Sequence, residues 1–205
     1  MLVGRWTKES TISIAEAESI PSPFLLNTFT DLKPTINYNN KFEYIPILTA
    51  NIYADLLIIF VTFSGILYSR KNIINKWYEK YRLSAMIADI LIGVLYLLLA
   101  RYITYQFKLN FDLFTFTLFA VFIQIILDFT FYLFFSIIPK GNNHMLDFFK
   151  KYAKEVGINA LLGDSILVVV GVIISAFLNE KSFDYNIVML ILSIYIAPYL
   201  IYMKD

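Results

Sequence analysis

The sequence predicts an all-α integral membrane protein, a helical bundle of about five transmembrane helices. Hydrophobic residues make up 59% of its 205 residues, against about 45–50% in soluble domains, and the mean hydropathy is +0.65. The chain also contains five apolar runs near the length of about 20 residues that crosses a bilayer. A soluble bundle would need a polar face on each run, and the second, fourth and fifth runs have none of useful width.

The N-terminal residues 1–46 are predicted to form an extended arm outside the membrane. Pro21, Pro23 and Pro34 disfavour helix, and the Asn-rich residues 37–40 favour turns. A short helix is expected only over 13–20. Pro46 then suits the first turn of a helix that enters the membrane.

The transmembrane domain is predicted over 47–203. Charged residues and prolines delimit its apolar runs, and the third ends at Pro139 and Lys140. The predicted spans are 47–68, 83–100, 113–138, 158–178 and 186–203.

Positive charge is concentrated in two of the four loops, which sets the predicted orientation. The loop after the first span contains five basic residues and the loop after the third contains four: Arg70, Lys71, Lys76, Lys80 and Arg82, and Lys140, Lys150, Lys151 and Lys154. The positive-inside rule places both loops in the cytoplasm. The N-terminus is then outside and the C-terminus is cytoplasmic.

Both basic loops are also expected to lie at the membrane surface. Aromatic side chains stand beside the basic ones in each, a combination typical of interfacial helices. The predicted interfacial residues are Trp77, Tyr81, Lys76, Lys80, Arg82, Tyr152 and Lys151. The favoured interpretation is an ordinary aromatic belt on the lipid bilayer, and docking of a specific lipid or partner is the alternative.

Four aspartates lie within the predicted spans: Asp55, Asp89, Asp128 and Asp164. An ionised Asp at the bilayer centre costs at least about 2.5–3.5 kcal/mol on insertion scales. No lysine or arginine lies inside a span to pair with them, because Arg82 and Arg101 are expected only at helix ends. These acids, with Gln124 on the face of Asp128, are therefore candidates for hydrogen-bonded packing or for a proton site.

An internal duplication is a further expectation. Without gaps, Lys76, Ala85, Asp89 and Val94 align with Lys151, Ala160, Asp164 and Val169. Small residues flank each acid at helical spacing, and the predicted helix-packing positions are Ala85, Gly93, Ala160 and Gly171. The corresponding architecture is two parallel-repeat hairpins, spans one–two and three–four, with a fifth helix added.

Several classes of function lack the residues they require. The chain has no cysteine and a single histidine, His144, so we expect no thiolate or multi-histidine metal site and no cofactor. Lysine and arginine number 17 against 16 acids, which indicates no nucleic-acid partner. No catalytic motif is present, and no catalytic residue is predicted.

Two resemblances bear on function. The element Ala160-Leu161-Leu162-Gly163-Asp164 is similar to the Gly-x-Gly-Asp element of intramembrane aspartyl proteases, but Leu161 stands where the first glycine belongs. The run from Trp77 to Asp89 resembles a segment of uncharacterised multi-pass membrane proteins of giant nucleocytoplasmic DNA viruses, as does the run 152–164. This second resemblance covers spans two to four and implies a viral or virus-remodelled membrane.

The first functional hypothesis is a structural or scaffolding membrane protein that forms homo-oligomers or contacts a capsid or host protein through its arm. The alternative is a small proton-linked transporter or channel that uses the intramembrane aspartates. An intramembrane aspartyl protease-like enzyme is the remote third hypothesis. The sequence leaves the substrate and the oligomeric state open.

Overall fold

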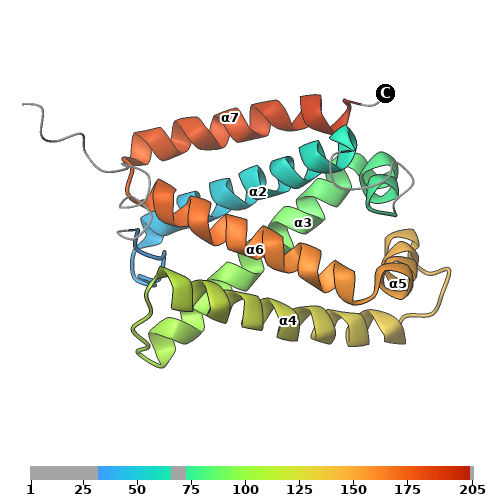
Figure 1. Ribbon diagram of the computed structural model, residues 1–205, viewed down its shortest axis with the longest axis horizontal. Helices are drawn as coiled ribbons and strands as arrows, with labels where there is room; N and C mark the ends of the chain where they lie inside the picture. Colours follow the sequence, from blue (N-terminus) through green and yellow to red (C-terminus); the bar gives the residue numbers. More distant parts are fainter. Residues whose placement is uncertain (1–31, 66–72, 204–205) are drawn as a thin grey trace, which may run out of the picture. The chain divides into compact units, whose positions relative to one another are not determined.

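The computed structural model describes residues 32–65 and 73–203, and within these ranges the regular secondary structure is entirely helical (Figure 1). A short 3₁₀ turn precedes six helices, five of which are long and apolar enough to cross a membrane. The elements are η2 (Lys41–Glu43), α2 (Tyr44–Ser64), α3 (Ile73–Gln106), α4 (Leu113–Ile137), α5 (His144–Val156), α6 (Ile158–Asn179) and α7 (Phe183–Ile201). The predicted fold class, an all-α bundle of about five spanning helices, is confirmed.

The helix ends differ from the predicted spans at several points. The first span, predicted over 47–68, begins at Tyr44 and is helical only to Ser64, where Gly65 adopts a left-handed conformation (φ 73°) that ends helices. Residues 66–68 lie outside the described ranges, as do residues 1–31 with the short helix expected over 13–20. The second helix extends beyond its predicted end at residue 100, to Gln106.

Helix α2 occupies the middle of the bundle. It packs against α3, α6 and α7, whereas α4 packs against α6 and α3 (Figure 1). Helices α4 and α7 carry many exposed apolar side chains, as expected for surfaces that face lipid tails. Examples are Phe114, Leu118, Phe122 and Phe129 on α4, and Val188, Ile191 and Ile194 on α7.

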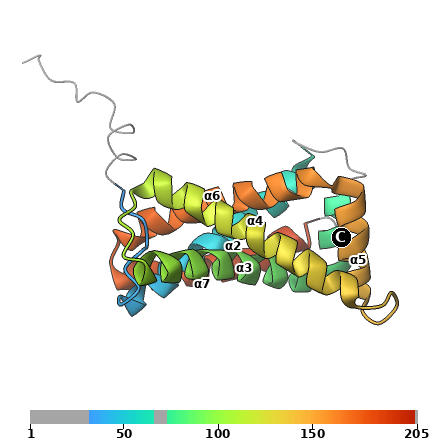
Figure 2. The ribbon, with the colours of Figure 1, turned by 90° about the horizontal axis from the view of Figure 1, so that it is seen from below.

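Two amphipathic helices precede spans and lie crosswise at one end of the bundle. The first is Ile73–Tyr81, which we call the lead helix, and the second is α5, which crosses the end of the bundle in Figure 2. The lead helix ends at Arg82 (φ 45°, ψ −121°), and α5 ends at Gly157 (φ 57°, ψ −130°). Positions 82 and 157 are aligned in the register of the expected duplication, which stays a prediction.

The end of the predicted arm is folded against the bundle, which corrects its description as extended. Leu32 and Thr35 are buried, and the Thr35 hydroxyl lies 3.3 Å from that of Ser175 on α6. Glu43 forms an ion pair with Arg101 of α3 at 3.3 Å. Arg101 therefore does not mark a helix end, as the sequence suggested, but is a buried residue inside α3.

The capping residues agree with the polar breaks between spans. Asp112 accepts a hydrogen bond from the backbone N–H of Thr115 at 2.7 Å and begins α4. This bond to the carboxylate lowers the pKa of Asp112. Asn143 and Ser182 cap α5 and α7 in the same way.

Candidate functional site: a carboxyl network between the spans

The four predicted intramembrane aspartates lie on four different helices, α2, α3, α4 and α6. Asp55 of α2 is fully buried. Its Oδ1 accepts a hydrogen bond of 2.9 Å from the hydroxyl of Tyr78, which belongs to the lead helix. Asp55 therefore joins the central helix of the bundle to the lead helix at the start of α3.

Asp89 lies in α3 after the break at Arg82 and contacts the lead helix that precedes the break. The indole Nε1–H of Trp77 donates to Asp89 Oδ2 at 2.9 Å. The hydroxyl of Tyr78 interacts with Asp89 as well as with Asp55. The break at Arg82 is what turns Trp77 and Tyr78 back toward the span, so the two residues reach acids that a continuous helix would keep apart.

Asp128 of α4 is the acceptor in a second set of contacts. The hydroxyl of Tyr96 on α3 and the side-chain amide of Gln124 both donate to its carboxyl oxygens. Gln124 Oε1 in turn accepts a hydrogen bond of 2.8 Å from the hydroxyl of Ser165 on α6. A continuous polar chain thus joins α3, α4 and α6.

Asp164 of α6 differs from the other three aspartates. Its side chain is exposed, and it has no hydrogen-bond or ion-pair partner among residues 32–65 and 73–203. It lies within electrostatic range of both Asp89 and Asp128. Asp89 and Asp164 nevertheless share no hydrogen bond in the described part of the chain, so they do not form the paired carboxyls that an aspartyl protease uses.

An amide four residues before an acid occurs on two helices of the network. Asn51 and Asp55 have this spacing on α2, as do Gln124 and Asp128 on α4, although the 75-residue register of the expected duplication does not align the two pairs. Asn51 is completely buried. Sequence reasoning missed Asn51, although an amide four residues before an acid in each hairpin was the available signal.

The predicted packing residues surround Asn51. A side chain at Gly93 would collide with the Asn51 amide oxygen and with Leu167, and one at Gly171 would come within 3.3 Å of the same oxygen. These two glycines let α2, α3 and α6 approach one another closely. Ala85 is also buried, whereas Ala160 is half-buried.

The predicted interfacial residues divide into an apolar and a basic group. The rings of Trp77 and Tyr81 pack against Phe148 of α5, with centroids 5.5 Å apart in both pairs. Lys76, Lys80 and Lys151 are exposed, and Arg82 lies over the ring of Tyr202 at 4.8 Å. Tyr152 lies on α5 and is half-buried.

No basic side chain neutralises the carboxyl network in the part of the chain that the structure describes. Arg101 is the one fully buried cation in that part of the chain. It is paired with Glu43 and donates hydrogen bonds to the carbonyls of Asn37 and Asn40. Neither does that part contain a group of His, Asp and Glu side chains suited to a metal ion. The arrangement can therefore cross-link helices or exchange protons.

Comparison of the chain with protein-family models, with curated proteins and with solved structures finds no match.

Proposed function

We propose that this multi-pass membrane protein has a structural or scaffolding role, with a rigid bundle that presents its N-terminal arm. The observation that carries the proposal is the use of Asp55, Asp89 and Asp128 as acceptors for donors from other segments. Each hydrogen bond between membrane helices contributes about 0.6–2 kcal/mol. A network of this kind favours one fixed arrangement of spans over a moving one.

A scaffold is held in place by its partners, so lateral mobility is the property to measure. Residues 32–43 belong to the bundle through Thr35 and Glu43, and the arm to delete is therefore 1–31. We expect the full chain to diffuse slowly in its native membrane, and the chain lacking residues 1–31 to diffuse at the rate of a free five-span protein. Fluorescence recovery after photobleaching measures both rates, and equal, fast recovery would reject the scaffold role.

The resemblance to membrane proteins of giant viruses extends this proposal to a viral or virus-remodelled membrane. Co-purification of the protein with virions would support that location. Finding the protein only in host membranes that the virus has not altered would contradict this location.

A second candidate function is proton-linked transport, and Asp164 is the observation that favours it. Its exposed carboxyl lacks a donor and lies close to Asp89 and Asp128. Since an ionised Asp at this depth is costly, the neutral acid is the favoured form and a proton can be held there. The Asp128 carboxyl and the hydroxyls of Tyr96 and Ser165 then supply neighbouring groups, with Gln124 holding Asp128 and Ser165 in place by hydrogen bonds.

Proteoliposomes with an internal pH dye test this second function. We expect wild-type protein to carry protons faster than empty liposomes, Asp164→Asn to abolish the flux, and Asp184→Asn to leave it unchanged. Asp184 is a suitable control because it is exposed in the first turn of α7. Wild-type flux no greater than that of empty liposomes would exclude proton transport and leave the scaffold role.

A further inference from the structure

The two amphipathic helices at one end of the bundle, with Lys140 of the preceding loop, line an open basic pocket of about 810 Å³. We call it the lysine pocket. Six lysines and two acids line it, together with apolar residues and His144: the lysines are Lys76, Lys80, Lys140, Lys150, Lys151 and Lys154, and the acids are Glu79 and Asp147. Its volume lies within the range of about 300–1,000 Å³ found for small-molecule sites.

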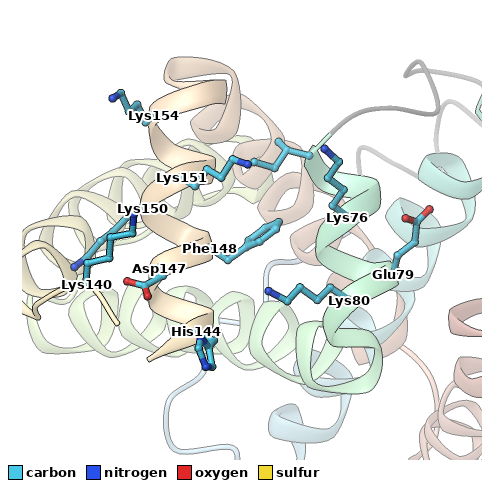
Figure 3. A pocket seen from close by; sticks show the side chains of 11 residues that line it. Lys76, Glu79, Lys80, Lys140, His144, Asp147, Phe148, Lys150, Lys151 and Lys154 are labelled. Atoms are coloured by element: carbon cyan, nitrogen blue, oxygen red, sulfur yellow. The ribbon is translucent and has the colours of Figure 1, made fainter. Parts of the chain in front are cut away.

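Both repeats contribute to the pocket. Lys76 and Lys80 come from the lead helix and are one helical turn apart, so they share a face. Lys151 comes from α5 and is aligned with Lys76 in the duplication. Figure 3 shows Lys76, Lys80 and Lys151 extending toward the gap between the two helices, with Phe148 inside it. Glu79 points to the other side of the lead helix in that view.

Acidic groups of the protein leave most of the positive charge of the lysine pocket without an ion-pair partner in the described part of the chain. The Asp147 carboxylate accepts the backbone N–H of Gly141 at 2.9 Å, and Lys150 donates to the carbonyl of Ile138. Lys151 forms only an exposed pair with Glu155 at 3.5 Å. Lys76, Lys140 and Lys154 have no acidic partner in the described part of the chain.

Aromatic packing holds the two helices at this separation. Trp77 lies 5.5 Å from Phe148 and 4.6 Å from Phe149, measured between ring centroids. Trp77 is itself fixed by its hydrogen bond to Asp89. The lysines are thus carried on a rigid framework directly beside the starts of the spans α6 and 83–106, where lipid headgroups lie.

We propose that the lysine pocket binds an anionic ligand carrying two or more phosphate groups, at the level of the lipid headgroups. Lys76, Lys80 and Lys151 converge from two helices, whereas Lys140, Lys150 and Lys154 extend on the other side of α5 in Figure 3. Three converging lysines match a multiply charged anion better than a single charge, and basic pockets between membrane helices bind phosphorylated headgroups. The Phe148 ring and the adjacent spans provide an apolar neighbour for the rest of a lipid. The same phosphate chemistry is carried by soluble polyphosphates, and the two sources are separable by experiment.

The test uses full-length protein in phosphatidylcholine nanodiscs that contain either a phosphatidylinositol bisphosphate or, at matched total charge, phosphatidylserine. We expect a higher thermal unfolding temperature with the bisphosphate lipid than with phosphatidylserine. Soluble inositol trisphosphate, added to nanodiscs of phosphatidylcholine alone, distinguishes the sources. Stabilisation by the lipid only identifies a headgroup site, and stabilisation by the soluble compound also identifies a site for free phosphates.

The variant to compare is Lys76→Gln, Lys80→Gln and Lys151→Gln combined. Each lysine near an anionic surface changes affinity roughly fivefold, so we expect binding on the order of 100-fold weaker. Its matched control is Lys41→Gln, Lys108→Gln and Lys181→Gln, which removes three exposed lysines outside the pocket. Circular dichroism at low temperature verifies that both variants keep wild-type helix content.

Two results would overturn the proposal. One is an equal rise of the unfolding temperature with phosphatidylserine and with the bisphosphate lipid, together with no rise on adding inositol trisphosphate. That result would mean that the protein responds to the negative charge of the membrane and not to grouped phosphates. The other is a loss of binding in the control variant as large as in the pocket variant.

Discussion

Gly157 connects α5 to α6 in a conformation that side chains disfavour (φ 57°, ψ −130°). The turn directs α5 across the end of the bundle and sends α6 into it (Figure 2). Arg82 adopts nearly the same angles at the position aligned with Gly157. Arg82 has a Cβ, so contacts such as the one with the Tyr202 ring must stabilise this conformation. The placement of the lead helix and of α5 therefore depends on the backbone conformation of one residue each, Arg82 and Gly157.

Substituting Gly157 tests this dependence. We expect Gly157→Ala to lower the free energy of unfolding by about 1–3 kcal/mol, because a Cβ strains this backbone conformation. Gly163→Ala is the control, since Gly163 is helical and nothing lies within 4 Å of an added Cβ. Unfolding in mixed micelles, followed by circular dichroism, measures both. Equal effects of the two substitutions would argue against strain at position 157.

The hydroxyl of Tyr78 is the second residue-scale feature with a measurable consequence. It donates to the buried Asp55, whose other carboxyl oxygen has no hydrogen-bond partner within residues 32–65 and 73–203. We expect Tyr78→Phe to destabilise the protein by about 1–3 kcal/mol, because a buried acceptor loses its donor.

Tyr195→Phe provides the comparison for Tyr78→Phe. Tyr195 is exposed, and its hydroxyl contacts only Tyr199 at 3.1 Å. The same unfolding assay should show little change for it. If Tyr78→Phe were equally harmless, Asp55 would not depend on this donor.

Among the elements, the connection between the end of the arm and α3 depends on one buried ion pair. The side chains of Arg101 and Glu43 are 1% and 4% exposed. Arg101 also donates to the carbonyls of Asn37 and Asn40, and its guanidinium lies over the ring of Tyr44 at 4.9 Å. These contacts close the end of the bundle opposite the lysine pocket and set where α2 begins.

A double-mutant cycle tests this connection. Removing one member of a buried pair leaves an uncompensated charge, so we expect Arg101→Met or Glu43→Gln to cost about 3–5 kcal/mol each. The double variant should cost less than the sum of the two, since neither charge is then left alone. Unfolding free energies measure all four proteins, and strict additivity would mean that the pair is not coupled.

At the scale of the whole molecule, two hairpins, formed by α2 with α3 and by α4 with α5 and α6, share an order of features, and α7 packs against α2. Each hairpin has an amide and an acid on its first helix, then a basic surface helix, a turn of positive φ and an acid on its second helix. The end of α7 at Tyr202 lies at the same end of the bundle as the lead helix and α5 (Figure 1). The charge bias predicts that this end is cytoplasmic.

The absence of cysteine makes this orientation directly measurable. We expect Lys80→Cys and Lys154→Cys to react with a membrane-impermeant maleimide only after the cytoplasmic face is opened. Lys108→Cys and Lys181→Cys should react on intact cells, because they lie in the two loops at the opposite end. The reverse pattern would invert the topology and place the lysine pocket outside.

The all-α class with five helices able to span a membrane followed from the sequence, because span length and hydropathy are properties of contiguous residues. Asp55, Asp89, Asp128 and Asp164 were recognisable as candidates for the same reason: a charge is costly inside an apolar run. Their partners were not, because Tyr78, Tyr96 and Ser165 meet the acids only through helix packing and through the break at Arg82.

The tertiary structure alone decided which of these acids are satisfied and where the remaining charges go. It brought Arg101 to Glu43, 58 positions earlier in the chain, and it left Asp164 exposed without a donor. It also made two basic loops line one pocket; the sequence favoured an ordinary aromatic belt for them and left docking of a specific lipid or partner as the alternative. The physical reason is that hydropathy acts along the chain, whereas hydrogen bonding and charge pairing depend on distances across it.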